Sequence, residues 1–361
     1  DGELFAGGFR SIVAIAWNNA DDHLYTIMHG RDYLHWNWPM FYTELEGAIL
    51  PSEEFFRIKK GDNAGWPYAY WDHLKNKKMQ APEYGGNGRM EAKDSSYLKP
   101  IVSFPGHFAP NDLLFYTGNQ FPERYRNGAF IAFHGSTSSA PYPQAGYFIA
   151  FVPFTNGQPS GAWEVFADGF AGRDTIYNTS DAKYRPMGLS QGPDGSLYVS
   201  ETEKGKIWRI MFKGDREKFG APALAAMDKR KAEAPNTKMP DELKDNLDRK
   251  DYSPAARTYN TYCGKCHERN GEGNNRFPPL KGSEWFAGDI QQPLHIVLNG
   301  MEVEMMVRGR RFINTMPAFA NVLTDEQLAD VLTYVKTEFN GAASGVSVQE
   351  VRKARKELFK K

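Results

Sequence analysis

The sequence predicts an all-β N-terminal part, a polar linker and a small all-α C-terminal part. Over residues 1–213, short apolar and aromatic runs alternate with Gly, Pro, Asn and Asp, which is typical of strands and turns. Over residues 214–250, charged residues, Ala and Pro dominate and no strand pattern is present. Over residues 251–341, apolar residues recur at helical spacing.

Composition supports two globular domains and argues against two classes of partner. The 361 residues suffice for two domains of about 150 residues each. Aromatic residues make up 14% of the chain, which predicts large aromatic-rich β surfaces. Lys+Arg and Asp+Glu both number 44, so no net charge attracts nucleic acid or a membrane surface. No apolar run approaches the roughly 18 residues of a transmembrane helix, so we expect no membrane span.

The β part contains a recurring turn pattern that would fit the blades of a propeller. An acidic turn followed by Leu and aromatic residues occurs at Asp22–Tyr25, Asp112–Tyr116 and Asp194–Tyr198. The copies lie farther apart than a roughly 40–50-residue blade, so long loop insertions or intermediate copies would be needed. A β-sandwich with similar turns is the alternative. The clearest strand candidates are Ser11–Trp17, Leu24–Met28, Ala129–Phe133, Gly146–Phe154 and Ile207–Phe212.

Helix signals dominate the rest of the chain. Within the linker, Ala223–Ala234 is a candidate helix. The all-α part begins at Ser253-Pro254, an N-cap followed by proline at the first helical position. Thr324 and Gln327 form a capping box that opens its last helix. Residues 342–361 end in a basic segment that we expect to be a solvated tail, with a docking helix as the alternative.

One motif, Cys263-Gly264-Lys265-Cys266-His267, carries the clearest chemistry. It is the attachment pattern of c-type haem, in which two thiols reach the vinyl groups and the adjacent imidazole lies beneath the iron. A redox dithiol or half of a zinc site would share the cysteine spacing. The chain has only these two cysteines, so no second pair is present for zinc, and a dithiol leaves the histidine unexplained. The sequence therefore predicts covalent haem c with His267 as one axial ligand.

The sixth ligand of the iron is expected downstream, in Met316-Pro317-Ala318-Phe319. A thioether ligand from Met316 would raise the reduction potential. We assign Met301, Met305 and Met306 to packing, and His295 is a minor alternative ligand.

Residues 251–341 resemble the class I cytochromes c, by virtue of the attachment motif, the Met316 loop and the terminal helix that begins at Thr324. In that family a proline-rich turn supplies a carbonyl to the axial histidine. The turn with Pro278 and Pro279 matches it, and such a bond fixes the tautomer of the ligand. Two filled axial positions favour electron transfer over oxygen chemistry.

A set of glycine-rich and aromatic motifs gives the β part a second resemblance. The motifs are Gly7-Gly8-Phe9-Arg10, His29-Gly30-Arg31-Asp32, Gly65-Trp66-Pro67, Phe115–Pro122, Ala129–Ser136, Tyr184–Gly188 and Gly192–Gly195. Together they resemble the soluble quinoprotein sugar dehydrogenases, specifically the sorbosone dehydrogenase-like group, over about Leu4 to Phe212. That resemblance implies a six-bladed β-propeller, about half of it present here, that binds pyrroloquinoline quinone (PQQ) and calcium.

The resemblance also implies site residues. Arg10 and Arg185 would contact PQQ, whose carboxylates suit guanidinium groups, and His134 would line the cofactor face. The segment Gly30-Arg31-Asp32 would supply oxygen ligands to calcium, including backbone carbonyls. In this family the metal polarises the quinone, a base removes the substrate hydroxyl proton, and hydride passes to the quinone.

The chain departs from the family pattern in two places. The Trp-Asn-Arg that commonly follows His-Gly-Ser is replaced by Thr137-Ser138-Ser139, which puts one contact to cofactor or substrate in doubt. The family's catalytic base is a histidine in the earlier half, so no catalytic base is assigned here. His107 is expected to lie on the substrate side of the funnel instead. Because an unclosed propeller exposes sheet faces, we expect the N-terminal half of the propeller in the same precursor or in another chain.

The favoured hypothesis is a periplasmic quinohaemoprotein dehydrogenase. It would oxidise a sugar or alcohol with PQQ, pass electrons to its own haem, and release them to an external cytochrome, oxidase or quinone pool. The alternative is an electron-transfer cytochrome subunit whose propeller portion is a non-catalytic interaction platform. A propeller that only binds carbohydrate is a third option, and it predicts no haem reduction by any substrate. Periplasm is expected because bacteria attach haem covalently outside the cytoplasm.

Overall fold

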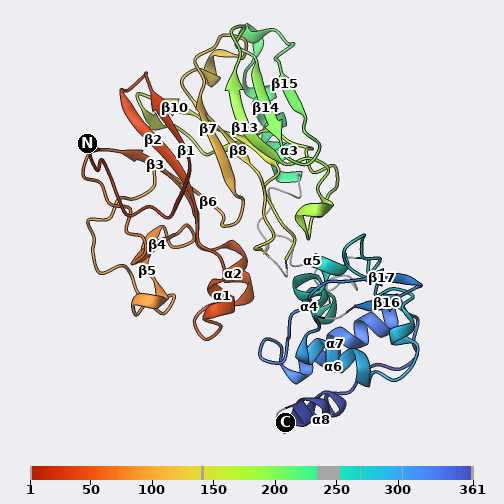
Figure 1. Ribbon diagram of the computed structural model, residues 1–361. Coiled ribbons are helices and arrows are strands. Elements are labelled where there is room, and N and C mark those ends of the chain that lie inside the picture. The colour runs from red at the N-terminus through yellow and green to blue at the C-terminus, as the bar shows by residue number, and fades with distance from the viewer. Residues whose placement is uncertain (1, 140–141, 234–252, 269, 303, 359–361) are drawn as a thin grey trace. The chain divides into compact units, whose positions relative to one another are not determined.

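The computed structural model describes residues 2–139, 142–233, 253–268, 270–302 and 304–358. The chain divides into two compact units, Asp1–Leu243 and Lys244–Lys361. The first is built mainly of antiparallel sheets and the second mainly of helices (Figure 1). None of the helices among these residues is long and apolar enough to cross a membrane.

The N-terminal unit contains three successive antiparallel sheets, and their strands follow one another along the chain. The first sheet holds β1 (Ser11–Asn18), β2 (His23–His29), β3 (Glu53–Ile58) and β6 (Val102–Phe104). The second holds β7 (Pro110–Phe115), β8 (Ala129–Phe133), β9 (Phe148–Val152) and β12 (Glu164–Ala167). The third holds β13 (Pro186–Gln191), β14 (Leu197–Glu201) and β15 (Ile207–Ile210).

The first strands of the three sheets lie side by side, with β7 packed between β1 and β13 (Figure 1). This fan of meandering sheets is the arrangement of propeller blades, and it excludes the β-sandwich alternative. The expectation of an all-β propeller portion is therefore confirmed. The five strand candidates from the sequence correspond to β1, β2, β8, β9 and β15.

Aromatic side chains fill both spaces between the blades. Every residue of β8 and β9 is buried, because the second sheet has a neighbouring sheet on each face. Along β8, Ile131 and Phe133 face the first sheet, and Phe130 faces the third. Burying an aromatic side chain contributes roughly 1.5–3 kcal/mol. The aromatic-rich surfaces predicted from composition are thus the interfaces between blades.

One of the predicted turn copies is wrong. Asp22–Tyr25 and Asp194–Tyr198 do lie where the first strand of a sheet turns into the second. Asp112–Tyr116 instead lies along β7, and the corresponding turn of the second sheet is at Asn127, whose φ is +60°. Asp112 flanks a β-bulge, where its carboxylate accepts hydrogen bonds from the N–H groups of Leu113 (2.8 Å) and Leu189 (2.6 Å).

Several smaller elements decorate the sheets. α1 (Leu34–Asn37) and α2 (Glu44–Ile49) interrupt the predicted all-β region, and α2 begins at a capping box of Thr43 and Glu46. Two hairpins are formed by β4 (Ala69–Asp72) with β5 (Lys77–Gln80) and by β10 (Phe154–Thr155) with β11 (Gln158–Pro159).

The start of the predicted linker needs correction. α3 (Ala221–Glu233) packs against β12, so it belongs to the propeller unit. Met227 packs on the aromatic core, and the Arg230 guanidinium pairs with Asp168 at 3.3 Å. The remainder of the predicted linker, 234–250, lies outside the described residues.

The C-terminal unit surrounds its own hydrophobic core. Its helices are α4 (Pro254–Tyr262), α5 (Gly264–His267), α6 (Gln291–Asn299), α7 (Asp325–Tyr334) with a π-helical turn at Val335–Phe339, and α8 (Val348–Leu358). A short hairpin of β16 (Met305–Val307) and β17 (Arg310–Phe312) departs from the all-α prediction. The predicted N-cap at Ser253 and the capping box of Thr324 and Gln327 are both present.

The C-terminal segment is a docked helix rather than a solvated tail. Val351 and Ala354 are 0% exposed and belong to the core of the C-terminal unit. α8 therefore packs an apolar face against α6 and α7 and leaves its charged residues outside.

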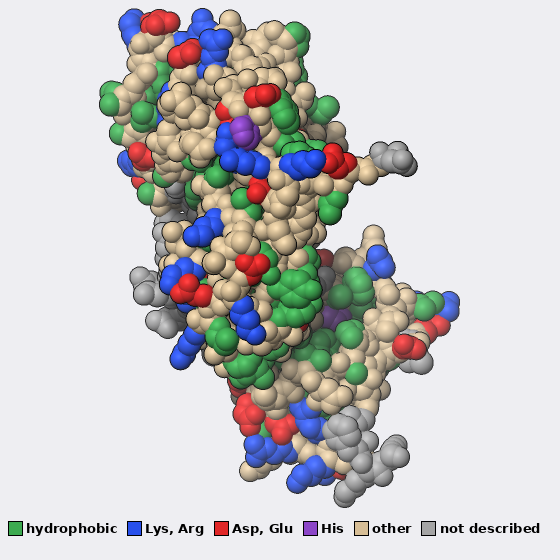
Figure 2. Space-filling model, turned by 90° about the vertical axis from the view of Figure 1, so that its left-hand side faces the viewer, with side chains coloured by type: hydrophobic (Ala, Val, Ile, Leu, Met, Phe, Trp, Pro, Cys, Tyr) green, Lys and Arg blue, Asp and Glu red, His purple; other side chains and the backbone are tan. Residues whose placement is uncertain are grey.

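On the face shown in Figure 2, basic and acidic side chains are interspersed, and the sequence holds equal numbers of each.

Candidate functional site

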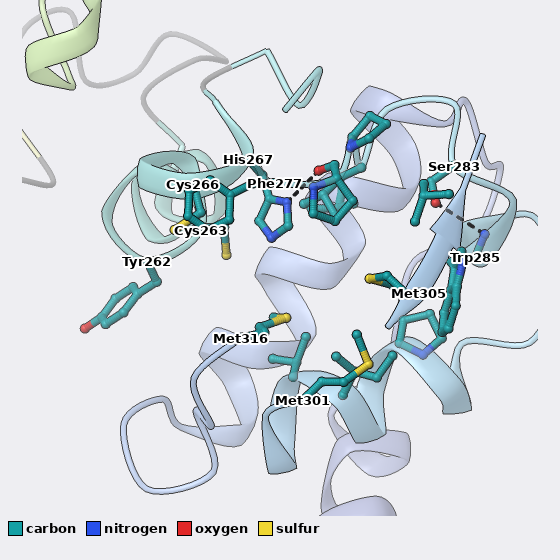
Figure 3. Close-up of a pocket in the computed structure, with 18 of the residues that line it drawn as sticks. Tyr262, Cys263, Cys266, His267, Phe277, Ser283, Trp285, Met301, Met305 and Met316 are labelled. Atoms are coloured by element: carbon teal, nitrogen blue, oxygen red, sulfur yellow. Dashed lines mark hydrogen bonds between the residues drawn. The ribbon is translucent and has the colours of Figure 1, made fainter. Parts of the chain in front are cut away.

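The attachment motif lies on one wall of an apolar pocket in the C-terminal unit. α4 ends where the Cys263 N–H donates to the Tyr259 carbonyl (2.8 Å), and the next helical turn closes with His267 N–H donating to the Cys263 carbonyl (2.9 Å). This turn brings Cys263, Cys266 and His267 to the pocket, which Tyr262 also lines (Figure 3). Local helix geometry alone therefore groups the two thiols with the imidazole.

The His267 ring is held in one orientation. Its Nδ1 atom donates to the Pro278 carbonyl at 2.8 Å, and Pro279 also lines the pocket (Figure 3). This bond places the proton on Nδ1 and leaves the lone pair of Nε2 for a metal. Burial lowers the pKa of His267, which favours the neutral, ligating form.

The electrostatics of the thiols argue against a redox dithiol. Burial raises the pKa of the Cys263 thiol to about 12, and the neighbouring Cys266 adds to the shift. Dithiol catalysts need a lowered thiol pKa, because the thiolate is the nucleophile. Over the described part of the chain, no three His, Cys, Asp or Glu side chains converge as a metal site.

Methionine side chains lie across the pocket from His267. Met301, Met305 and Met316 all line it, and the sulfur atoms of Met305 and Met316 point into it (Figure 3). Met306, by contrast, is 52% exposed, and His295 lines a separate pocket. Two thiols, an imidazole with a bare Nε2, facing thioethers and an apolar lining together fit a covalent haem.

A second cluster of predicted site residues lies in the propeller unit. The Arg10 Nη1 atom donates to the Gly30 carbonyl (2.7 Å), and its Nη2 atom is 3.6 Å from the Asp32 carboxylate. Asp32 also lies 3.2 Å from His107 Nδ1. Burial raises the pKa of Asp32, but hydrogen bonds from His107 and Ser138 and the charge of Arg10 outweigh it and lower the pKa to about 2. Asp32 is therefore ionised at neutral pH.

His107 is more enclosed than the sequence suggested. The side chain is buried, and its Nε2 atom lies 3.0 Å from the Gly47 carbonyl. Each ring nitrogen thus faces an oxygen acceptor. Its backbone φ is +70°, a conformation that costs energy for a residue other than glycine. This geometry favours a role for His107 in orienting Asp32, rather than the position on the substrate side that was expected from the loop.

His134 and Arg185 form the third part of the site. The Arg185 Nη2 atom donates to His134 Nδ1 (2.8 Å) and to the Gly135 carbonyl (2.7 Å). Burial lowers the pKa of His134 to about 4, and the positive charge of Arg185 acts in the same direction. The ring is therefore neutral, with its proton on Nε2, which lies 2.9 Å from the Thr202 hydroxyl.

Residues outside the predicted set join these groups. Glu53, which is 2% exposed, accepts hydrogen bonds from Gly30 N–H (2.8 Å) and Ala109 N–H (3.1 Å). It ties the loop after β2 to the loop before β7. His29 Nε2 lies 3.1 Å from Asn111 Oδ1, and the Ser138 hydroxyl bonds Asp32. Two adjacent acidic residues at the start of β3 were the only sequence signal, and burial of a Glu cannot be read from such a pair.

The predicted calcium segment is only partly brought into this cluster. The Arg31 side chain pairs with Glu83, in the 3-10 turn Pro82–Tyr84 that follows β5, and stacks on Trp38 at the end of α1 (4.7 Å to the ring centroid). Calcium takes oxygen ligands that include backbone carbonyls, and the Gly30 carbonyl, which accepts from Arg10, is one such group in this segment. The paired guanidinium groups of Arg10 and Arg185 fit the carboxylates of a quinone cofactor.

Comparison with known proteins divides the chain as the fold does. Residues 1–213 match the family model described as TrAA12-like, and residues 250–335 match that of cytochrome c oxidase, cbb3-type, subunit III. The C-terminal unit is thus a cytochrome c domain fused to the propeller portion.

Similar curated proteins include two enzymes or enzyme subunits. A pyrroloquinoline quinone-dependent pyranose dehydrogenase of Coprinopsis cinerea is 26% identical over 236 residues, covering 57% of this chain and 29% of that protein. A gluconate 2-dehydrogenase cytochrome c subunit of Pantoea cypripedii is 33% identical over 113 residues, covering 30% of this chain and 25% of that one. An uncharacterized protein of Borreliella burgdorferi is 27% identical over 214 residues, covering 58% of this chain and 49% of that one. The chain spans half or less of the length of these relatives.

Among solved structures, the calcium structure of a Trichoderma reesei family AA12 protein aligns with a TM-score of 0.43 at 20% identity. The alignment covers 56% of this chain and 52% of that one.

Proposed function

Because the chain belongs to the TrAA12-like family, we propose that it is part of a quinohaemoprotein dehydrogenase that oxidises a sugar or alcohol with PQQ. Electrons would then pass to its own haem c. The observation that carries this proposal is the convergence of Arg10 and Arg185 with Asp32 and His134 where loops of three blades meet, in a chain that also carries a haem attachment site.

The residues of this chain would act by binding and orienting. Arg10 and Arg185 would hold carboxylates of the cofactor, and ionised Asp32 and neutral His134 fix the two guanidinium groups. The Gly30 carbonyl would be one oxygen ligand for calcium, and Glu53 holds that loop in place. PQQ, when bound, supplies the oxidant for hydride transfer from the substrate. The catalytic base is not assigned to any residue of this chain.

In the cytochrome unit, Cys263 and Cys266 would bind haem covalently, with His267 and Met316 as axial ligands. The bond from His267 Nδ1 to the Pro278 carbonyl would keep the ligating Nε2 atom directed at the iron. The haem supplies a one-electron carrier. We propose a periplasmic location and an external cytochrome, oxidase or quinone pool as acceptor.

The experiment mixes the complete natural protein with PQQ, calcium and a panel of aldoses and alcohols, and follows the α-band of reduced haem. We expect reduction that requires substrate, PQQ and calcium together. Arg185→Ala should raise the PQQ concentration needed for half-maximal haem reduction by about tenfold or more. Arg173→Ala, which removes an exposed guanidinium 3.5 Å from Asp181, is the matched control.

If dithionite reduces the haem but none of the substrates does, the proposed dehydrogenase activity is contradicted. That outcome supports the alternative, in which the propeller portion is a non-catalytic interaction platform. Substrate oxidation with an artificial dye but without haem reduction would contradict only the path from quinone to haem.

A further inference from the structure

We infer that α8 clamps the loop that presents Met316, with Arg355 as the positioning residue. This loop, residues 314–323, is called the ligand loop below. α8 begins at Val348, beyond the stretch 250–335 that matches the cytochrome family model. The inference rests on Met316 as the sixth ligand of the proposed haem.

The front of the ligand loop is tied to the end of α6. Met301 and Met316 exchange two backbone hydrogen bonds, at 2.9 and 2.8 Å. Phe319 N–H donates to the Val297 carbonyl at 2.9 Å. Pro317 follows Met316 directly and restricts the backbone between these contacts. The segment is therefore stiff, and a shift at its far end would move the Met316 sulfur.

Arg355 holds that far end. Its Nη1 atom donates to the Ala320 carbonyl, and its Nη2 atom donates to the Leu323 carbonyl at 2.8 Å. Its Nε atom donates to Asp325 Oδ1 at 2.7 Å, in the first turn of α7. The side chain is 19% exposed, so these bonds are partly shielded from water. A planar guanidinium makes all three bonds at once, which the single ammonium of lysine cannot reproduce.

The position of Arg355 is itself fixed by packing. Val351 and Ala354, on the buried face of α8, are 0% exposed within the core of the C-terminal unit. α8 contacts both α6 and α7. Because α6 holds the front of the ligand loop and Arg355 holds its end, α8 closes a frame around the residues that follow Met316. Loss of the guanidinium should loosen the bond between iron and sulfur without removing the haem.

Arg352 provides a matched control on the same helix. It lies nearly one turn before Arg355 and pairs with Asp325 (3.2 Å) and Glu326 (2.8 Å), both of which belong to the first turn of α7. Its side chain is 55% exposed. Both arginines therefore pair with Asp325, and only Arg355 also bonds the loop.

The test titrates imidazole into the ferric full-length holoprotein, because imidazole competes with Met316 for the iron. Arg355→Ala should bind imidazole about tenfold more tightly than wild type, and Arg355→Lys should shift in the same direction. Arg352→Ala should stay within about twofold of wild type, as is usual for exposed ion pairs. The red charge-transfer band of thioether-ligated ferric haem should weaken in the same order.

Equal imidazole affinity in wild type and Arg355→Ala, or an equal shift in Arg352→Ala, would overturn the role of Arg355. If Arg355→Ala does not take up haem, Arg355→Lys decides alone, and wild-type affinity there overturns the inference. Absence of the charge-transfer band in wild type would mean that Met316 does not ligate the iron, and this outcome also overturns the inference. None of these measurements uses PQQ or substrate, so failure of the proposed dehydrogenase activity would be seen separately.

Discussion

At the scale of single residues, the candidate site depends on charged and neutral side chains that hold each other in fixed protonation states. Asp32 is ionised beside Arg10, and His134 is neutral beside Arg185. Each guanidinium is thus oriented before any anionic ligand arrives, which reduces the cost of binding. Because these protonation states differ from those in the unfolded chain, the stability of the propeller unit should depend on pH.

The pKa of His134 predicts that the propeller unit loses stability in mild acid. In the folded chain the pKa is about 4, below the ordinary 6.5, so the unfolded chain takes up the proton first as pH falls. Between pH 6.5 and 4, lowering the pH therefore destabilises the folded state, by on the order of 1 kcal/mol once solvent screening is allowed for. We expect the free energy of unfolding in urea, followed by tryptophan fluorescence, to fall less between pH 7 and 5 in His134→Gln. A variant with the wild-type slope would contradict this.

Gly300 gives a second prediction at this scale. Its φ is +71°, and a Cβ atom there would lie 2.6 Å from the Met316 carbonyl. Gly300→Ala should therefore push the ligand loop away, destabilise the cytochrome unit by about 1–3 kcal/mol and lower the reduction potential of the haem. Potentiometric titration of the haem measures the shift. Gly288→Ala is the control, since a Cβ atom there meets nothing within 4 Å, and an equal effect of both changes would sink the argument.

At the scale of elements, helix ends set the positions of the haem-binding groups. α4 ends at the first cysteine, α6 ends at Gly300, and α7 begins directly after the ligand loop. His267 and Met316, the proposed axial ligands, thus lie at junctions between helices, where the helix caps set the path of the chain. Stability of the cytochrome unit should respond to changes in these caps.

The capping box of α7 can be tested directly. The Thr324 hydroxyl accepts from Gln327 N–H (3.2 Å), and Gln327 Oε1 accepts from Thr324 N–H (3.0 Å). Thr324→Ala should lower the free energy of unfolding of the cytochrome unit by about 1 kcal/mol, because the Gln327 N–H group loses its acceptor. Denaturation followed by the circular dichroism of the haem band provides the measurement. Asp330→Ala, on the exposed face of the same helix, should change little.

At the scale of the whole molecule, the first blade carries an apolar face that β1 leaves uncovered. Ile12, Ile15 and Trp17 point to this face and are 46%, 64% and 52% exposed. On β2 and β3 the same face is covered by residues such as Phe9 and Leu98. In a closed propeller, the face of one blade packs on the next.

We therefore expect this face to bind the dye ANS. Ile15→Ser should lower the fluorescence of the bound dye, because it removes apolar surface from the face. Leu74→Ser is the control, because Leu74 is similarly exposed (58%) but lies in the turn between β4 and β5. A wild-type chain that binds no dye, or an equal loss of fluorescence in both variants, would disprove the expectation.

The features that could be predicted from the sequence are those that depend on residues close together in the chain. The strands of the blades, the N-cap at Ser253, the capping box of Thr324 and the attachment motif all follow from local spacing. Each is a pattern within a few residues, so no knowledge of distant contacts is needed. The failed turn copy at Asp112 shows the limit, because the same letters serve as a turn in one blade and as a bulged strand in another.

Contacts between residues far apart in the chain could be identified only from the folded structure. Glu53 and His107 join the site because three loops converge, and α8 docks because Val351 and Ala354 find a core built from residues of other helices. Burial of a carboxylate or docking of a basic helix depends on the surfaces offered by the rest of the fold. Local patterns carry no record of those surfaces. The chemistry of the haem motif was therefore readable from the chain, whereas the frame that holds its ligands was not.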